Sequence, residues 1–323
     1  MSLRSLALSI IVAGLTLVPA AQAQEFPVTI SHAYGETTVP AKPLRIVTWG
    51  WAGQDAVIAL GEVPVGVPFF SYGGDEQGVL SWTREAVEAL GATYPSILPE
   101  AAEPPVEAIA ALQPDLILAV YSGLTEDEYN VLSGIAPVIA FPTGPWATTW
   151  QDTITITGEA MGKKAEAETL VADLETFIAE ETAKYPVVAG TSFAGIMDYN
   201  GEIAVYGPSD ARVEFLVDAG MVVPEGFAAL SPDDDFYFSL SYENLDQLGS
   251  DILISYFDTP QADADFYARS VIALAPPVKQ GAVAHIIGPQ LVSSMSPPSA
   301  LSLKWGYPQY IKLIGEAAEN ASN

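Results

Sequence analysis

The sequence GEAMGKKAEAETLVADLETFIAEETAK, residues 158–184, divides the chain into two halves and decides the fold. It contains no proline, and its only glycines are Gly158 and Gly162. Its larger apolar residues recur on one face of a helix: Leu170, Leu174, Phe177 and Ile178. This spacing is typical of a helix with a single apolar stripe, which Pro186 would end. We expect a long connecting helix over residues 158–185, although a surface helix of a single domain would show the same pattern.

Short apolar runs alternate with helical stretches on both sides of this segment. A hairpin is expected first, from residues 29–32 and 34–39. The expected strands then cover residues 45–49, 64–67, 116–120, 138–141, 187–189, 203–206 and 252–254. Such alternation predicts parallel sheets with helical crossovers. The expected fold is therefore α/β, with two lobes that each hold a central parallel-type sheet flanked by helices, joined by the single long helix, and with a ligand cleft between them. The lobes would span residues 24–157 and 186–323.

A short internal repeat supports the division into two lobes. Residues 106–118 read VEAIAALQPDLIL, and residues 242–254 read YENLDQLGSDILI. Identical residues occupy the same positions in both copies: Glu107 and Glu243, Leu112 and Leu248, Asp115 and Asp251. An aspartate in a turn before a buried strand is common, so coincidence is the alternative. We favour a repeated unit of helix, turn and strand.

The first residues resemble a secretory signal peptide. Arg4 precedes an apolar run over residues 6–18, and Ala21-Gln22-Ala23 forms a small-residue cleavage site. The run is shorter than the roughly 20 residues of a membrane-spanning helix, although an uncleaved anchor is the alternative. The chain has no cysteine, which a lipoprotein signal requires. We therefore expect residues 1–23 to be removed and the mature chain to be periplasmic and not a lipoprotein.

Composition argues against several classes of function. The 12 basic and 40 acidic residues give a net charge of −28, which disfavours nucleic acids and anionic lipids as partners and direct insertion into a membrane. Two histidines and no cysteine disfavour a zinc or manganese site. Asp233-Asp234-Asp235 could form an oxygen-ligand site, or simply an acidic surface loop. Residues 190–195 only imitate a nucleophile elbow, because the second glycine comes one residue late. We expect no enzyme, no cofactor and no metal bound by the protein itself.

Aromatic residues gather where the expected strands end. Parallel α/β sheets bind ligands beyond the carboxyl ends of their strands, so two facing sheets would enclose a cleft with aromatic walls. The residues at these ends are Trp49, Trp51, Phe70, Tyr72, Tyr121, Trp146, Tyr199 and Tyr256. Each of them alone could equally be a core residue. Together they predict a pocket for a large, partly apolar ligand.

Several stretches carry a resemblance to a known family. The sequence GETTVPAKPLRIV at residues 35–47, residues 107–118 and SYENL at residues 241–245 resemble periplasmic iron-siderophore binding proteins of ABC importers. The resemblance implies two lobes joined by one long helix, and a ferric siderophore captured between them for an inner-membrane permease. It also implies that Glu107 and Glu243 pair with arginines of the permease dimer. The alternative is that each glutamate only complements a helix dipole.

The basic residues point to the kind of chelate. After the leader, the arginines are Arg45, Arg84, Arg212 and Arg269, and Arg45 matches a strand-entry position. Arg84 and Arg212 are the ligand candidates, with Phe236 and Tyr237 as further wall residues. Members of the family that this chain resembles usually offer several arginines to the cleft where they bind anionic catecholates, so the resemblance implies a neutral or cationic ferric hydroxamate here. Haem, cobalamin, a periplasmic enzyme acting on an iron chelate and a receptor-like sensor are the alternatives, and a monomer is expected.

Overall fold

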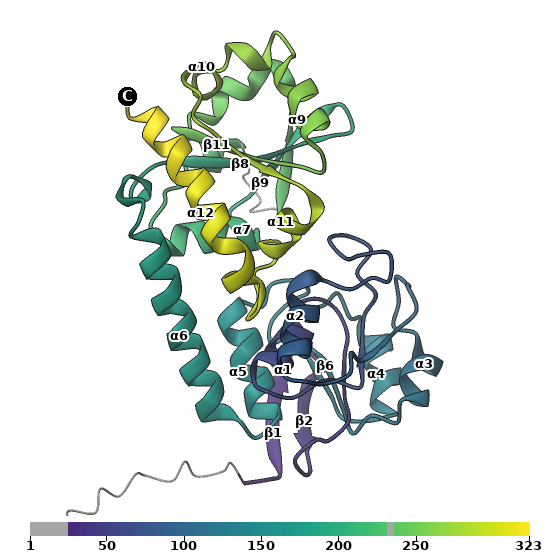
Figure 1. Cartoon of the computed structure of the whole chain (residues 1–323). Coiled ribbons are helices and arrows are strands. Elements are labelled where there is room, and N and C mark those ends of the chain that lie inside the picture. The colour runs from purple at the N-terminus through teal and green to yellow at the C-terminus, as the bar shows by residue number, and fades with distance from the viewer. Residues whose placement is uncertain (1–24, 231–235) are drawn as a thin grey trace, which may run out of the picture.

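The computed structural model describes residues 25–230 and 236–323 (Figure 1). The expected signal peptide, residues 1–23, and the acidic triad at residues 233–235 lie outside these ranges. Among the helices within them, none combines the length and apolar character that crossing a bilayer requires.

The N-terminal lobe is built on a parallel sheet, as the sequence predicts. The hairpin that precedes it pairs β1 (Val28–His32) with β2 (Gly35–Val39). The order of strands in the sheet is β5 (Ser96–Ile97), β4 (Gly66–Val67), β3 (Ile46–Thr48), β6 (Leu116–Ala119) and β7 (Val138–Ala140). The helices are α1 (Gly53–Ala59), α2 (Ser81–Ala89), α3 (Val106–Ala111), α4 (Glu126–Ser133) and α5 (Trp150–Ala160). Strands β3, β6 and β7 are buried throughout, which explains their largely apolar sequences.

The C-terminal lobe is built on a mixed sheet. The order of strands is β10 (Tyr237–Leu240), β9 (Glu202–Tyr206), β8 (Phe193–Tyr199), β11 (Ile252–Phe257) and β12 (Val283–Ile287). Strands β8, β11 and β12 are parallel, whereas β9 and β10 are antiparallel additions. The helices are α7 (Ala211–Asp218), α8 (Phe227–Leu230), α9 (Pro260–Tyr267), α10 (Pro276–Gln280), α11 (Pro289–Ser294) and α12 (Ser302–Ala321). The two-lobed α/β fold is confirmed.

Three short 3₁₀ segments complete this lobe: η1 (Pro186–Val188), η2 (Tyr242–Leu248) and η3 (Ile272–Leu274). The strand expected at residues 187–189 is wrong, because this stretch forms η1. Pro186 occupies its first turn, where the fixed φ of proline favours a helical start over the extended backbone of a strand.

The long helix between the lobes is α6 (Lys164–Thr182), which runs up one side of the molecule (Figure 1). It starts later than the expected residue 158, because Gly158 still belongs to α5. A Cβ atom on Gly158 would lie 2.3 Å from the Cβ of Ala167, so glycine allows α5 and α6 to touch. Gly162 turns the chain between them with φ of +71°. Residues 158–184 therefore form the end of a helical hairpin and the connecting helix.

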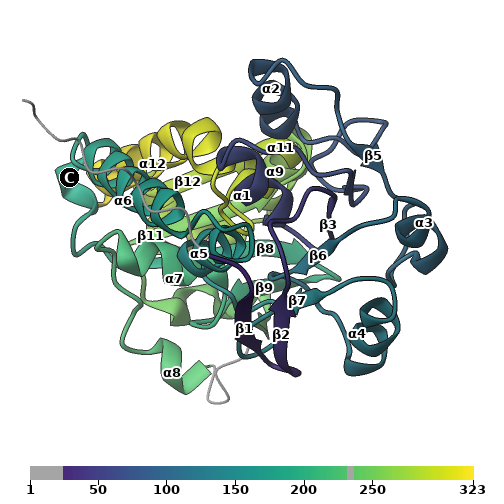
Figure 2. The ribbon, with the colours of Figure 1, turned by 90° about the horizontal axis from the view of Figure 1, so that it is seen from below.

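The C-terminal segment makes a second junction between the lobes. Trp305 of α12 packs on Trp82 of α2, with 5.3 Å between ring centroids. Beside them, the buried carboxylate of Asp55 on α1 accepts hydrogen bonds from Trp82 Nε1 and Thr83 Oγ1, both 2.8 Å, and from Ser299 Oγ. Figure 2 shows α1, α2, α11 and α12 on the same side of the molecule. This junction therefore joins the lobes in addition to α6.

Both copies of the repeat form a helical segment followed by a strand, although the first is the α-helix α3 and the second is the 3₁₀ segment η2. The Asp115 carboxylate accepts hydrogen bonds from the backbone N–H groups of Leu44 and Arg45, both at 2.8 Å, just before β3. The Asp251 carboxylate accepts them from Ser192 N at 2.8 Å and Ser192 Oγ at 2.6 Å, just before β8. Strand β6 lies between β3 and β7, as β11 lies between β8 and β12. Each repeat aspartate therefore fixes the entry of the neighbouring strand.

Candidate functional site

A cavity of about 330 Å³ opens between the two lobes, where the strands of both sheets end. The N-terminal lobe contributes Trp51, Tyr121 and Trp146 to its lining. The C-terminal lobe contributes Asp210, Ala211, Arg212 and Phe236, and the loop before α12 contributes Ser296 and Pro297. The N-terminal lining residues follow β3, β6 and β7, and the carboxyl ends of parallel strands are the position at which α/β sheets bind ligands. Trp51, Tyr121, Trp146, Arg212 and Phe236 were all expected at a ligand site, and the structure brings them together.

The N-terminal wall is aromatic and is held by backbone hydrogen bonds between loops. Trp51 N donates to Tyr121 O at 2.9 Å, and Trp146 N donates to Ser122 O at 3.1 Å. The Tyr121 and Trp146 rings meet edge to face, 5.7 Å between centroids. Trp146 has a left-handed backbone, with φ of +59°, and its side chain is 38 % exposed. Its indole lies so close to Gly123 that a Cβ atom there would be 2.7 Å from Nε1.

A second pocket of about 400 Å³ adjoins the first and shares Trp51 and Trp146 with it. Trp49 and Phe70 also line this pocket, so seven of the expected aromatic and basic ligand residues border the two spaces. Its outer part is polar, with Glu128 near the surface. The two pockets together provide a broad space with several aromatic side chains in its walls, which suits a bulky ligand.

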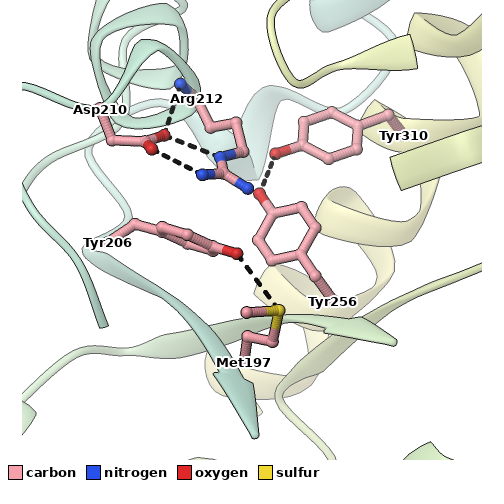
Figure 3. Close-up of polar contacts among 6 residues, drawn as sticks. All are labelled: Met197, Tyr206, Asp210, Arg212, Tyr256 and Tyr310. Atoms are coloured by element: carbon pink, nitrogen blue, oxygen red, sulfur yellow. Dashed lines mark hydrogen bonds and ion pairs between the residues drawn. The ribbon is translucent and has the colours of Figure 1, made fainter. Parts of the chain in front are cut away.

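The C-terminal wall is organised around the buried side chain of Arg212 (Figure 3). Asp210 binds this guanidinium with both carboxylate oxygens, at 2.7 Å to Nε and 2.6 Å to Nη2. The guanidinium carbon lies 3.4 Å above the centre of the Tyr206 ring. The Tyr256 ring lies beside that of Tyr206, with its centre 5.5 Å from the guanidinium carbon, and its hydroxyl pairs with that of Tyr310 at 2.6 Å. This wall therefore presents one arginine, held rigidly by a carboxylate and aromatic rings.

Burial decides the protonation states here. It opposes the charge on Arg212, but the hydrogen bonds and the charge of Asp210 raise the pKa of the guanidinium above its ordinary value. Burial, followed by the charge of Asp210, raises the pKa of the Tyr121 phenol. Burial likewise raises the pKa values of Tyr206 and Tyr256. The tyrosines are therefore neutral at ordinary pH and can donate hydrogen bonds.

The other expected ligand residues lie outside both pockets. Tyr256 is buried below Arg212, and Arg84 pairs with Asp75 on the surface. Tyr199, at the end of the central strand β8, and Tyr237, on the edge strand β10, are exposed at 48 % and 50 %. Their ligand roles stay predictions.

Tyr72 bridges the lobes near the pockets. Its hydroxyl donates to the Asp258 carboxylate across the gap, at 2.8 Å. Tyr72 follows β4 and Asp258 follows β11, so this bond joins the carboxyl ends of strands from opposite sheets.

Several lining residues escaped the sequence analysis, and Asp210 is the most important. It begins α7 as its N-cap, accepting a hydrogen bond from the backbone N–H of Arg212 at 2.9 Å. An aspartate two residues before an arginine at a helix start was the available signal. Ser296 and Pro297 carry no comparable signal, because their place in the cleft depends on the packing of α11 and α12.

The structure places both expected docking glutamates on the surface, each in the first turn of its segment. Glu107 lies on α3 and Glu243 on η2, and both side chains are exposed. Their equivalent positions follow from the repeat. The docking role itself stays a prediction.

Neither histidine lies at the cleft. His32 Nε2 contacts Thr37 Oγ1 at 2.9 Å, and His285 Nδ1 contacts Asp263 at 2.8 Å. Within residues 25–230 and 236–323, no three acidic or histidine side chains gather into a group that could hold a metal ion. Tyr121 is the residue in the cavity lining that could serve as an axial haem ligand.

Comparison with known proteins identifies relatives along most of the chain. YfiY of Bacillus subtilis, whose name describes a siderophore-binding lipoprotein, is 28 % identical over 239 residues, 73 % of this chain and 70 % of YfiY. The ferric enterobactin-binding periplasmic protein FepB of Escherichia coli is 28 % identical over 296 residues, 84 % of this chain and 88 % of FepB. The crystal structure of Streptococcus pneumoniae PiaA in complex with ferrichrome superposes with a TM-score of 0.81 at 32 % identity. That match covers 91 % of this chain and 99 % of PiaA.

These relatives contradict the expected localisation, a periplasmic protein that is not a lipoprotein. YfiY is named a lipoprotein, and so is YhfQ of Bacillus subtilis, which is 30 % identical over 164 residues. The mode of attachment to the membrane therefore varies among proteins that share this fold. An N-terminal leader pattern does not determine the mode of attachment, and the prediction that the chain is not a lipoprotein is withdrawn.

The match to a family model agrees with the fold and with the position of the cleft. The model for periplasmic binding proteins matches residues 46–287, from the first strand of the N-terminal sheet to the last strand of the C-terminal sheet. The matched region includes the central sheets of both lobes, α6 and most of the cavity lining. The chain belongs to the periplasmic binding protein family.

Proposed function

We propose that this chain is the substrate-binding component of an ABC importer, and that it captures a ferric siderophore between its lobes and delivers it to a membrane permease. The observation that carries the proposal is the cavity between the lobes, with an aromatic wall on one side and the Arg212–Asp210 pair on the other. Relatives named for siderophore or ferric chelate binding support the choice of ligand.

A ferric hydroxamate fits this cleft better than an anionic chelate. Arg212 is the only basic residue among those that line the two pockets in the described part of the chain, and Asp210 compensates its charge. PiaA, which shares the fold at 32 % identity, was crystallised with ferrichrome, a neutral hydroxamate complex. Shape, aromatic contact and a few hydrogen bonds would therefore hold the ligand, with little contribution from net charge.

The proposed action is capture without a chemical step. The chelator keeps the iron coordinated, and neutral tyrosines such as Tyr121 donate hydrogen bonds to its oxygen atoms. Because α6 and the junction around Asp55 both join the lobes, we expect only a small closure on binding. The protein would act as a binding protein with no cofactor of its own.

Delivery would use the two exposed glutamates. Glu107 and Glu243 occupy equivalent positions of the repeat, one on each lobe. Two carboxylates placed in this way match a permease built from two similar halves with basic residues at its mouth. Charge pairing of this kind would fix the orientation of docking more than its affinity.

The test is a tryptophan-fluorescence titration of the purified protein with ferrichrome, ferric enterobactin, ferric dicitrate, haem and cobalamin. Trp49, Trp51 and Trp146 line the pockets, so an iron complex bound there should quench their emission. We expect saturable quenching by ferrichrome at micromolar or lower concentration, and recovery of the chelate unchanged. A response to haem or cobalamin alone would show that the proposed ligand is wrong. A change of the bound chelate with time would indicate an enzyme in place of a binding protein.

A further inference from the structure

Asp210 and Arg212 form a compensated charge pair in the wall of the cleft. Their side chains are 9 % and 16 % exposed, so water screens them little, and both residues line the cavity. Two hydrogen bonds join them in parallel, at 2.7 and 2.6 Å, the geometry in which carboxylate and guanidinium bind most strongly. A ligand in the cavity therefore meets a charged pair with no net charge.

The carboxylate is what keeps this wall electrically neutral. Tyr206, which stacks below the guanidinium, is a neutral phenol whose pKa burial raises further. Tyr256 and Tyr310, the neighbouring hydroxyls, are neutral for the same reason. Without the negative charge of Asp210, the guanidinium of Arg212 would face the ligand without the carboxylate that pairs with it. A single unpaired charge in a partly buried site has a large effect on the binding of a charged ligand.

We propose that Asp210 is the residue that determines charge selectivity in this cleft, because by neutralising Arg212 it favours ferric chelates without net negative charge over anionic ones. This inference rests on the proposed function, since it concerns how the same site chooses among ferric siderophores.

Asp210 also has a structural role that must be separated from the electrostatic one. Its side chain caps α7 by accepting a hydrogen bond from Arg212 N at 2.9 Å. Asparagine caps helices about as well as aspartate, and serine does so too. The change Asp210→Asn therefore keeps the cap and a hydrogen bond to Arg212 while removing the charge. Asp210→Ser is a second uncharged variant, for use if the first does not fold.

A matched control removes the same charge elsewhere on the same helix. Asp218 is exposed at the other end of α7 and lies outside both cleft pockets. Asp218→Asn therefore changes the net charge of the protein as Asp210→Asn does, but leaves the cleft unchanged. Asp210→Glu is the conservative variant that should retain wild-type selectivity.

The experiment measures the dissociation constants of neutral ferrichrome and anionic ferric enterobactin for each protein at two salt concentrations. For wild type we expect tighter binding of ferrichrome. For Asp210→Asn we expect the affinity for ferric enterobactin to rise at least about tenfold at low salt and less at high salt, with ferrichrome changed by no more than about threefold. A loss of structure alone would weaken both ligands and would not produce a gain that depends on salt.

Two results would overturn the inference while leaving the proposed function intact. One is an Asp210→Asn variant that binds ferric enterobactin no better than Asp218→Asn does. The other is a wild-type protein that binds the anionic chelate more tightly than the neutral one, which needs no variant at all. A wild-type protein that binds no ferric chelate would instead overturn the proposed function.

Discussion

Replacing Gly123 by alanine should weaken ligand binding through one displaced side chain. A Cβ atom at this position would lie 2.7 Å from Nε1 and 2.8 Å from Cζ2 of the Trp146 indole. Carbon atoms in good contact are about 3.5–4.0 Å apart, so the indole must move by roughly 1 Å. Trp146 is 38 % exposed and has room to do so, and the cost in protein stability should be small.

The cost in affinity follows from the position of Trp146 in both cleft pockets. Full burial of a large apolar side chain contributes about 1.5–3 kcal/mol. Partial loss of this contact should cost on the order of 1–2 kcal/mol, or about five- to thirtyfold in the dissociation constant for ferrichrome. Isothermal titration calorimetry would measure this loss, and tryptophan emission would report the displaced indole.

Gly144→Ala is the matched control. Gly144 lies on the same loop as Trp146, and a Cβ atom at this position would have no other atom within 4 Å. It should bind like wild type. If Gly123→Ala also binds ferrichrome with wild-type affinity, then Trp146 is not part of the ligand wall and the reasoning fails.

Three further predictions concern other parts of the molecule. Burial raises the pKa of Asp55 above its ordinary value of 3.8, so its contribution to stability is largest in acid and is lost as the pH rises through the folded-state pKa. In urea unfolding, the stability of wild type relative to Asp55→Asn should therefore fall with rising pH, and a difference that grows with pH would contradict this. Tyr72→Phe removes the hydrogen bond to Asp258 between the lobes, and stopped-flow should show ligand release about fivefold faster, equivalent to roughly 1 kcal/mol; an unchanged rate would exclude a role in closure. The double variant Glu107→Gln, Glu243→Gln should lower uptake through the permease, while the isolated protein should bind its ligand normally. Normal uptake by this variant would show that neither residue is needed for docking.

The architecture was predictable because it follows from local patterns. Apolar strands with helices between them, and one long helix between the halves, are visible in the sequence and confirmed in the structure. The start of the long helix was not predictable from its apolar stripe. The stripe begins only at Leu170, and the close contact of Gly158 with Ala167 reveals the helical hairpin that precedes it. The expected strand at residues 187–189 failed because Pro186 outweighed two β-branched residues.

The site was predictable in its general place and only in part by residue. The end of a strand brings an aromatic residue near the cleft, but the direction in which its side chain points depends on the sheet. Tyr121 reaches the cavity from the end of β6, whereas Tyr256, within β11, lies below Arg212. Asp210 was missed because its importance comes from pairing with Arg212, which only the three-dimensional structure shows.

The most direct test of the central claim is an anomalous difference map at the iron absorption edge, from crystals of the protein grown with ferrichrome. The account predicts one iron peak in the cavity between Trp146 and Arg212, surrounded by chelator oxygen atoms and without a protein ligand. A peak on another surface, or an iron coordinated directly by a side chain such as Tyr121, would contradict it.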